Sequence, residues 1–210
     1  MKQQASFSIK YRYYRFIPFK SLLLGIIKKR IDSIVDPSID FIENGDNILD
    51  IGAGTGWVAE EIKKRKKTNA TLLDVTDFNQ TDLKLVLYEG KIMPFEDNSF
   101  DVVFINFVLH HTDNPIEVLK EAKRVSRRNV IIFEDTYTSG TGYFFLCLWD
   151  YISNLPSFLV APFTEKMPFN FKTVTDWRNV FYNLDLKIIS EKEYRGNIAK
   201  HVLFVLKKSK

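Results

Sequence analysis

The segment that most constrains this chain runs from Ile48 to Trp57 and has the sequence I-L-D-I-G-A-G-T-G-W. A short apolar run at 48–51 predicts a buried strand. Three glycines follow at once, and after them Val58, Ala59 and Ile62 have the spacing of one helix face. A strand, a glycine turn and a helix in this order bring bare backbone close to a nucleotide-like ligand.

The spacing of the glycines argues against a dinucleotide. The segment is G-x-G-x-G, and the third glycine of a G-x-G-x-x-G fingerprint would fall on Trp57. Asp50, just before the turn, would repel a pyrophosphate but can accept a hydrogen bond from a cationic amine. The turn therefore favours a positively charged adenosyl ligand over NAD.

Two further motifs follow the glycines in a fixed order, M-P-F-E-D-N-S-F-D-V at 93–102 and V-L-H-H-T-D-N-P at 108–115. With them, the segment 47–135 resembles the class I S-adenosylmethionine-dependent methyltransferases, in particular the group that acts on small molecules. The resemblance implies a Rossmann-like α/β fold, with a seven-stranded, mostly parallel sheet and helices on both faces. It also implies methyl transfer to a small acceptor, with S-adenosylmethionine as cofactor.

Length and composition set the outer limits. The chain has 210 residues, of which 45% are apolar, which suits one α/β domain with a full core. Cys147 is its single cysteine, which excludes an internal disulfide and a cysteine-based zinc site, and we predict no metal site. No apolar run approaches the ~20 residues that span a bilayer, and residues 1–6 lack a signal-peptide core. These features predict a cytoplasmic protein.

We divide the chain into four parts. They are an amino-terminal helical cap (1–45), a cofactor-binding core (46–135), an apolar insertion or lid (136–172), and a carboxyl-terminal helix and strand pair (173–210). The cap is expected to hold two short helices. Strands are expected at 48–51, 70–75, 84–88, 100–106, 129–133, 186–189 and 201–206, and helices after the glycines, from Pro115, and at 175–184. We expect no full helix between 75 and 83, and a tight turn at 126–129.

Asp74 is the candidate ligand for the ribose. It ends the second predicted strand, 18 residues after Gly56, close to the spacing at which an acid meets ribose hydroxyls. Asp77 is a nearby rival. The resemblance extends the cofactor site to Val75 and Glu89–Gly90 at the adenine, and to Asn106 and Phe107 at the methionine. The turn itself contributes Asp50, Gly52, Ala53, Gly54, Thr55 and Gly56.

The predicted catalytic residues are His111 and Asp135. Glu134 and Asp135 end the fifth strand at the carboxyl edge of the sheet, where an acid can contact the acceptor or act as a general base. By the resemblance, a histidine at 110 or 111 lies near the substrate. A structural role, holding a loop carbonyl, stays open for both histidines.

The apolar run at 143–163 sets the expected acceptor. It is too apolar for a solvated loop, so with residues 11–19 we expect a movable cover over a small, hydrophobic acceptor. Peripheral contact with a membrane, and action on a lipid or a quinone, is the main alternative. A protein or nucleic-acid methyltransferase is another, although the net charge is only +4 and no base-flipping Asn-Pro-Pro-Tyr motif follows the fourth strand. A partner subunit without activity would usually have lost the glycine turn.

Overall fold

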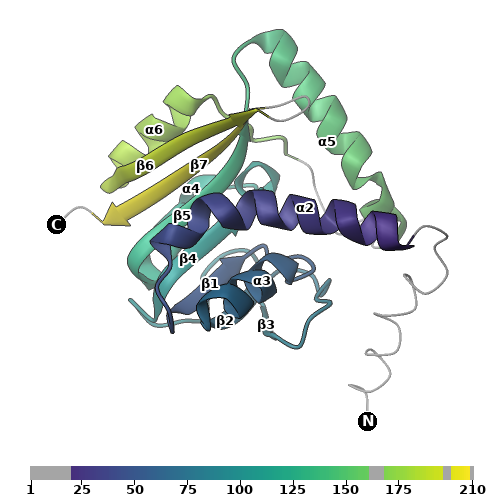
Figure 1. Cartoon of the computed structure of the whole chain (residues 1–210). Coiled ribbons are helices and arrows are strands. Elements are labelled where there is room, and N and C mark those ends of the chain that lie inside the picture. The colour runs from purple at the N-terminus through teal and green to yellow at the C-terminus, as the bar shows by residue number, and fades with distance from the viewer. Residues whose placement is uncertain (1–19, 161–167, 196–199, 209–210) are drawn as a thin grey trace.

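The computed structural model describes residues 20–160, 168–195 and 200–208. It shows one twisted sheet with helices on both faces (Figure 1). The first of the two helices expected in the cap, the predicted cover segment at 11–19, and residues 161–167 of the predicted insertion lie outside the described residues.

The strands are β1 (Asn47–Ile51), β2 (Asn69–Asp74), β3 (Lys84–Leu87), β4 (Phe100–Asn106), β5 (Ser126–Thr136), β6 (Leu186–Arg195) and β7 (Lys200–Lys208). The α-helices are α2 (Lys20–Ser38), α3 (Trp57–Lys66), α4 (Pro115–Val125), α5 (Gly140–Val160) and α6 (Val174–Asn183). Two short 3-10 helices, η1 (Ile39–Phe41) and η2 (Leu109–His111), complete the list of described helices.

The sheet has the strand order β3-β2-β1-β4-β5-β7-β6. All pairs are parallel except those of β7, which lies antiparallel between β5 and β6. The predicted fold class is therefore confirmed. The chain order reverses between β1 and β4, and ligands of open α/β sheets bind beyond the carboxyl ends of the strands at such a point. The glycine turn leaves β1 there.

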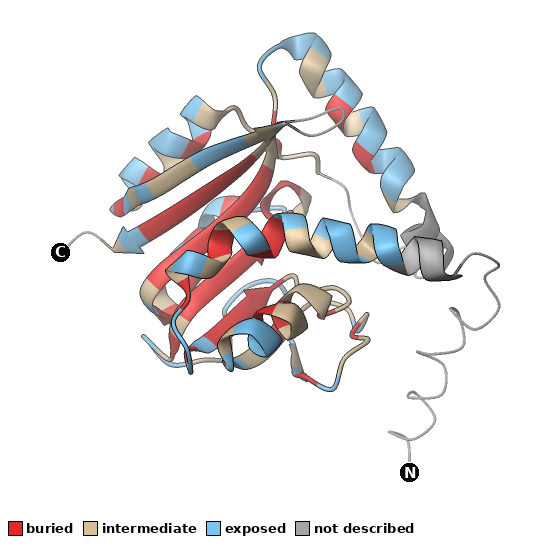
Figure 2. Cartoon of the chain, in the orientation of Figure 1, coloured by how far each residue is buried: buried red, intermediate tan, exposed pale blue. Residues whose placement is uncertain are grey.

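The two larger hydrophobic cores hold the layers together, one on each face of the sheet, and the strands between them are mostly buried (Figure 2). On one face, α4 and α6 bury Leu119, Ala122, Trp177 and Phe181 against alternate residues of the strands. On the other face, α2 and α3 bury Ile34, Val35 and Ile62. Strands that are covered on both sides are apolar in their buried part, which explains the apolar run Val102–Ile105 within β4.

Helix starts follow local signals. Asn114 caps α4 by accepting a bond from the N–H of Glu117, and Pro115 takes the first helical position. At α6, Thr173 and Asp176 form a capping box. No helix forms at 75–83, all of which the structure describes, as predicted. The Asn79 side chain holds this loop instead, accepting from Thr81 N and donating to Leu83 O over 3.0 Å.

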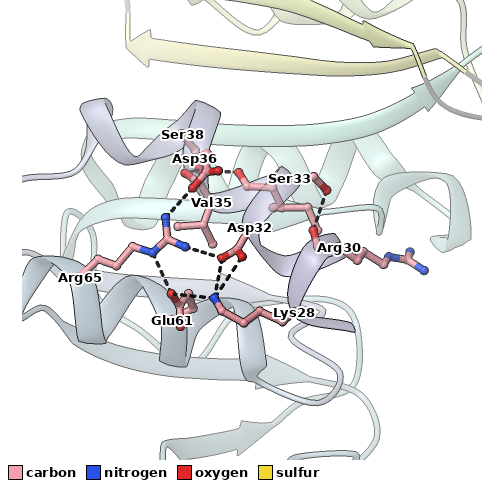
Figure 3. Close-up of polar contacts among 10 residues, drawn as sticks. Lys28, Arg30, Asp32, Ser33, Val35, Asp36, Ser38, Glu61 and Arg65 are labelled. Atoms are coloured by element: carbon pink, nitrogen blue, oxygen red, sulfur yellow. Dashed lines mark hydrogen bonds and ion pairs between the residues drawn. The ribbon is translucent and has the colours of Figure 1, made fainter. Parts of the chain in front are cut away.

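Two predictions of local structure were wrong. Residues 126–128 do not form a tight turn, because β5 begins at Ser126, which pairs with Phe100 across an irregularity in the ladder. In the described part of the cap, residues 20–45, α2 has 19 residues and is longer than the short helix expected there, and the 3-10 helix η1 follows it. The length of α2 brings a row of acids over α3, and Arg65 of α3 contacts both Asp32 and Asp36 of α2 (Figure 3).

The predicted apolar insertion forms the helix α5, which extends beyond the carboxyl ends of the parallel strands (Figure 1). Leu146 and Asp150 are buried on its inner side. Large apolar side chains on its outer side are about half exposed or more, namely Phe144, Phe145, Leu148, Trp149 and Ile152. Most of α5 is therefore not part of the main core.

Candidate functional site

The glycine turn between β1 and α3 is left-handed at each of its three glycines, with φ of +65°, +51° and +76° at Gly52, Gly54 and Gly56. A Cβ on Gly52 would lie 2.3 Å from Val108, and one on Gly56 would lie 2.7 Å from Leu72. A Cβ on Gly54 would meet nothing within 4 Å. The outer glycines thus permit close packing within the protein, while the middle one borders open space.

Asp74 lies directly beside this open space. One of its carboxylate oxygens accepts the N–H of Gly54 over 2.8 Å, and the other accepts those of Val75 and Thr76 over 2.7 and 3.2 Å. Burial raises the pKa of Asp74, although these backbone donors oppose the rise. The rival Asp77 accepts instead from Asn79 N over 3.1 Å, in the loop that follows. Of the two acids, the structure brings Asp74 to the glycine turn.

Asp50 lies within β1 and is only 2% exposed. Burial, with a smaller contribution from the charge of Asp74, raises the pKa of its carboxyl group to about 8. A carboxylic acid with this pKa is largely neutral at pH 7 and ionises readily when a cation lies beside it.

The remaining predicted cofactor residues border the same edge of the sheet. Val75 is 53% exposed, and a Cβ on Gly90 would lie 3.6 Å from it; Glu89 is exposed beside them. At the end of β4, the side-chain oxygen of Asn106 is buried and has no hydrogen-bond partner among the described residues. Such an orphaned acceptor is rare in folded proteins and calls for an explanation.

Phe107 marks the sharp exit from β4. It has a φ of +54°, unusual for an aromatic residue, and its N–H donates to Phe133 O over 2.7 Å. Its ring contacts the rings of Phe133 and His201 edge-on, at 5.5 and 5.2 Å between centroids. The chain is thereby turned into η2, which carries both histidines of the L-H-H motif.

Glu134 holds this turn in place. It is completely buried, and it accepts bonds from Val108 N (3.0 Å), Leu109 N (2.7 Å) and His110 Nδ1 (2.6 Å). Burial disfavours the His110 cation, but the carboxylates of Glu134 and Asp150 outweigh it and raise the pKa of His110. The prediction that Glu134 contacts an acceptor or acts as a base was wrong, because its oxygens are already bonded inside the protein.

His111 and Asp135 lie at the same edge and are only partly buried. Burial and the neighbouring His110 lower the pKa of His111 to about 4, so its imidazole is neutral at pH 7. Asp135 pairs with His201 of the adjacent strand β7, through His201 Nδ1. The charge of Asp135 acts on His111 as well. The structure thus gathers both predicted catalytic residues near the open end of the sheet.

Two residues of this site were not predicted from the sequence. His201 of β7 was not among the candidate residues, yet its Nδ1 pairs with Asp135. Asp150 of α5 was not considered at all, and its Oδ1 lies 3.7 Å from His110 Nε2 and 3.6 Å from His111 Nε2. One signal was present, since Asp150 is the single charged residue between 140 and 160.

Known proteins match this chain mainly in its core. Residues 49–133 match the family model of the methyltransferase domain. The ubiquinone/menaquinone biosynthesis C-methyltransferase UbiE of Bdellovibrio bacteriovorus is 34% identical over 103 residues, which cover 40% of this chain and 40% of that protein. The chain spans about two fifths of the length of the curated relatives it matches.

Two solved structures share the fold over most of the chain. The magnesium protoporphyrin IX methyltransferase ChlM of Synechocystis PCC 6803, solved with bound SAH, has a TM-score of 0.63 at 13% identity and covers 95% of this chain and 93% of its own. The [4+2]-cyclase SpnF has a TM-score of 0.65 at 11% identity and covers 86% and 80%. At these identities the likeness concerns the fold alone.

The strand order, the glycine turn and the family match agree. Residues 49–133 resemble the methyltransferase domain, and the fold around them is that of the class I methyltransferases, the class of enzyme that uses S-adenosylmethionine as cofactor. Of the described helices, none combines the length and the apolar character that crossing a bilayer requires.

Proposed function

We propose that this chain transfers a methyl group from S-adenosylmethionine to a small, hydrophobic acceptor. The observation that carries the proposal is the open space at Gly54, beside a carboxylate, in a turn whose other two glycines are packed. Because the middle glycine packs against nothing within 4 Å, the turn leaves room for a ligand beside its backbone.

The residues present fit the adenosyl half of the cofactor. A carboxylate has about four acceptor positions, and three backbone N–H groups bond to that of Asp74, which leaves capacity for a ribose hydroxyl. The exposed apolar surface of Val75, with Gly90 beside it, suits one face of the adenine ring. Glu89 is then near enough to accept from the adenine edge.

The methionine half of the cofactor requires partners for an amine and a carboxylate. Asp50 would accept from the cationic amine, and a cation at this buried carboxyl group would favour its ionised form. The unpaired oxygen of Asn106 would accept a further N–H. Both are acceptors at the carboxyl ends of adjacent strands, which supports a cationic ligand there.

The reaction requires alignment more than charge stabilisation. When bound, S-adenosylmethionine supplies an electrophilic methyl group on a sulfur that leaves uncharged. The chain must hold the acceptor in line with this methyl group, and such positioning can supply several kcal/mol. We assign acceptor contact to His111 and Asp135. A neutral His111 can accept a proton from the acceptor, and Asp135 is oriented by His201.

The composition of α5 supports a hydrophobic acceptor. Its inner side approaches His111 through Asp150, and its outer side exposes Phe144, Phe145 and Trp149 by 47–63%. Exposed apolar side chains in such density mark interaction sites, so we propose that this outer face touches a membrane surface from which a lipophilic acceptor is taken. The match to a quinone-biosynthesis methyltransferase supports an acceptor of this kind.

A second function on this fold has one observation in its favour, the likeness to a [4+2]-cyclase. That fold likeness says nothing about the site, and methyl transfer is preferred because the family match covers the glycine turn and the L-H-H motif. A nucleic-acid methyltransferase is less well supported, because the face around α5 is apolar.

The test is binding followed by turnover. Calorimetry should show binding of S-adenosylmethionine and S-adenosylhomocysteine and none of NAD. Transfer of a labelled methyl group should then be measured with quinols, phenols and fatty acids in detergent micelles, against polar amines and tRNA. Binding of the cofactor with transfer only to polar acceptors would refute the hydrophobic acceptor. Absence of cofactor binding would refute the proposal as a whole.

A further inference from the structure

Three potential metal ligands converge where η2 meets α5. They come from His110, His111 and Asp150, each of which offers one ligand atom, and these three atoms lie within 4.8 Å of one another. Asp150 Oδ1 is 3.7 Å from His110 Nε2 and 3.6 Å from His111 Nε2. Ligand atoms bound tetrahedrally at about 2.0–2.1 Å from a metal lie about 3.3 Å apart. Shifts of a few tenths of an ångström would thus close the two measured gaps.

The ring of His110 is held as a metal ligand would be. Its Nδ1 bonds to Glu134 Oε2 over 2.6 Å, with both side chains buried. A histidine ligand nearly always donates its second ring N–H to such a partner, which leaves Nε2 free to bind the metal. Phe171 stacks on the same ring at 4.3 Å, and Asn170 N donates to the backbone carbonyl of His110 over 2.9 Å.

The carboxylate of Asp150 carries the second, independent observation. The residue is 8% exposed, and its Oδ2 is buried without any hydrogen-bond partner among the described residues. Its Oδ1 accepts from Asn154, one turn further along α5, over 3.1 Å. A buried carboxylate oxygen without a donor is costly, and a cation bound beside it would remove that cost.

We propose that His110, His111 and Asp150 bind one divalent transition-metal ion, of the kind that prefers imidazole nitrogen, such as Zn²⁺. Two histidines and one carboxylate leave coordination positions open. His111, whose side chain is 30% exposed, borders the side from which a further ligand can enter. The metal site does not depend on the proposed function.

The role of the metal does rest on the proposed function, since it specifies the acceptor as one that offers an oxygen ligand. Coordination of a hydroxyl to the metal lowers its pKa. Its O–H bond breaks and the proton goes to solvent, the oxygen forms a bond to the methyl carbon, and the electrons of the broken S–CH₃ bond stay on sulfur. His111 Nε2 has one lone pair, so binding the metal would replace the proton-accepting role proposed above for a metal-free His111.

The experiment uses the full chain without a histidine tag, depleted of metal with a chelator and titrated with Co²⁺. One equivalent should bind and give the visible absorption of a nitrogen- and oxygen-ligated Co²⁺, and mass spectrometry should find one Zn²⁺ after reconstitution with zinc. Asp150→Asn and His111→Gln should each weaken Co²⁺ binding about tenfold or more. The matched control is His201→Gln, the third histidine of the chain, which should keep one equivalent.

Absence of the Co²⁺ absorption, or equal binding by both ligand variants and the wild type, would overturn the metal site. In that case His110 simply carries a proton between two carboxylates. If Asp150→Asn does not fold, His111→Gln alone tests the metal site, because His111 is partly exposed and its replacement should leave the fold intact. Acetohydroxamate, an oxygen-donor probe, should shift the Co²⁺ spectrum, and an unchanged spectrum would overturn the acceptor role. Binding of S-adenosylhomocysteine, measured on the same samples, tests the proposed function separately.

Discussion

The backbone N–H of Gly54 donates to Asp74 Oδ2 over 2.8 Å, which ties the middle of the glycine turn to the end of the neighbouring strand β2. This bond fixes a carboxylate beside the open space that a ligand requires. Replacing Asp74 would therefore disturb the turn as well as the ligand contact. A test of the ligand contact needs a control variant at a nearby acid.

Asp74→Ala should weaken binding of S-adenosylmethionine by about 1.5–3 kcal/mol, the usual value of a hydrogen bond to a charged group. Asp77→Ala is the control, since Asp77 lies three residues further on and bonds within its own loop. Calorimetry on both variants decides the assignment. Equal losses, or a larger loss for Asp77→Ala, would move the ribose contact to the loop after β2.

Gly54→Val should abolish binding while the protein still folds, because the new side chain fills the open space at a left-handed residue. Gly45→Val is a matched control. Gly45 also has a positive φ, of +86°, and a Cβ there also meets nothing within 4 Å, but it lies before β1 and away from the turn.

Both valine variants should lose stability by a similar amount, on the order of 1–3 kcal/mol for the strained backbone. Only Gly54→Val should lose S-adenosylhomocysteine, as measured by thermal shift with and without the ligand. A Gly54→Val protein with unchanged affinity would mean that the ligand does not lie over the turn.

Binding of the cation should depend on pH through Asp50, whose pKa is about 8 in the free protein. A cationic ligand favours the ionised carboxylate and lowers this pKa, so binding below pH 8 must release a proton. The affinity for S-adenosylmethionine should rise between pH 6 and 7.5, by at most tenfold per pH unit. Calorimetry in buffers of different ionisation enthalpy measures the number of protons released on binding. The Asp50→Asn variant should release no proton.

The same pKa has a consequence for stability. Folding raises the pKa of Asp50 from 3.8 to about 8. The contribution of this group to the free energy of unfolding is therefore fully present below pH 4 and is lost as the pH rises towards 8. Asp50→Asn, which does not titrate, should therefore gain stability relative to the wild type as the pH rises from 4 to 8, by up to about 1.4 kcal/mol per pH unit. Denaturant unfolding at several pH values with no such trend would contradict a buried, neutral Asp50.

The parts of the fold that sequence alone predicted have local causes. β4 was predicted with its observed bounds because a strand buried on both faces has an apolar centre, here Val102–Ile105, and α4 was predicted because Asn114 and Pro115 mark its start. The start of β5 has a different cause. Ser126 joins the sheet only because Phe100 of β4 lies opposite it, and such pairing across the chain has no signal in the local sequence.

The candidate site divides in the same way. The glycine turn and Asp74 follow one another along the chain, and their spacing was enough to predict them. Asp150 comes close to the histidines only because α5 packs on η2. Glu134 was wrongly predicted as an acceptor contact because it is the folded turn, which bonds to Glu134 through the N–H groups of Val108 and Leu109, that buries it. Residues that tertiary packing brings together escaped prediction, although the lone charge in an apolar helix was visible.

The last prediction concerns the outer face of α5. Phe145 and Trp149 lie one turn apart on that face and are 59% and 47% exposed. Burying one large apolar side chain is worth about 1.5–3 kcal/mol, so two of them can hold the protein at a lipid surface. Phe145→Ser with Trp149→Ser should therefore reduce co-sedimentation with liposomes at least tenfold. The fold should be retained, since neither side chain belongs to the two main cores.

Tyr182→Ser is the matched control for this double variant. Tyr182 is an aromatic residue of α6, not of α5, and is 82% exposed, so its loss should leave liposome binding unchanged. Neutral and anionic vesicles should be compared, because a contact made by apolar side chains should persist in neutral ones, whereas the net charge of +4 acts only on anionic ones. Equal sedimentation of the double variant and the wild type with neutral vesicles would rule out α5 as the lipid contact.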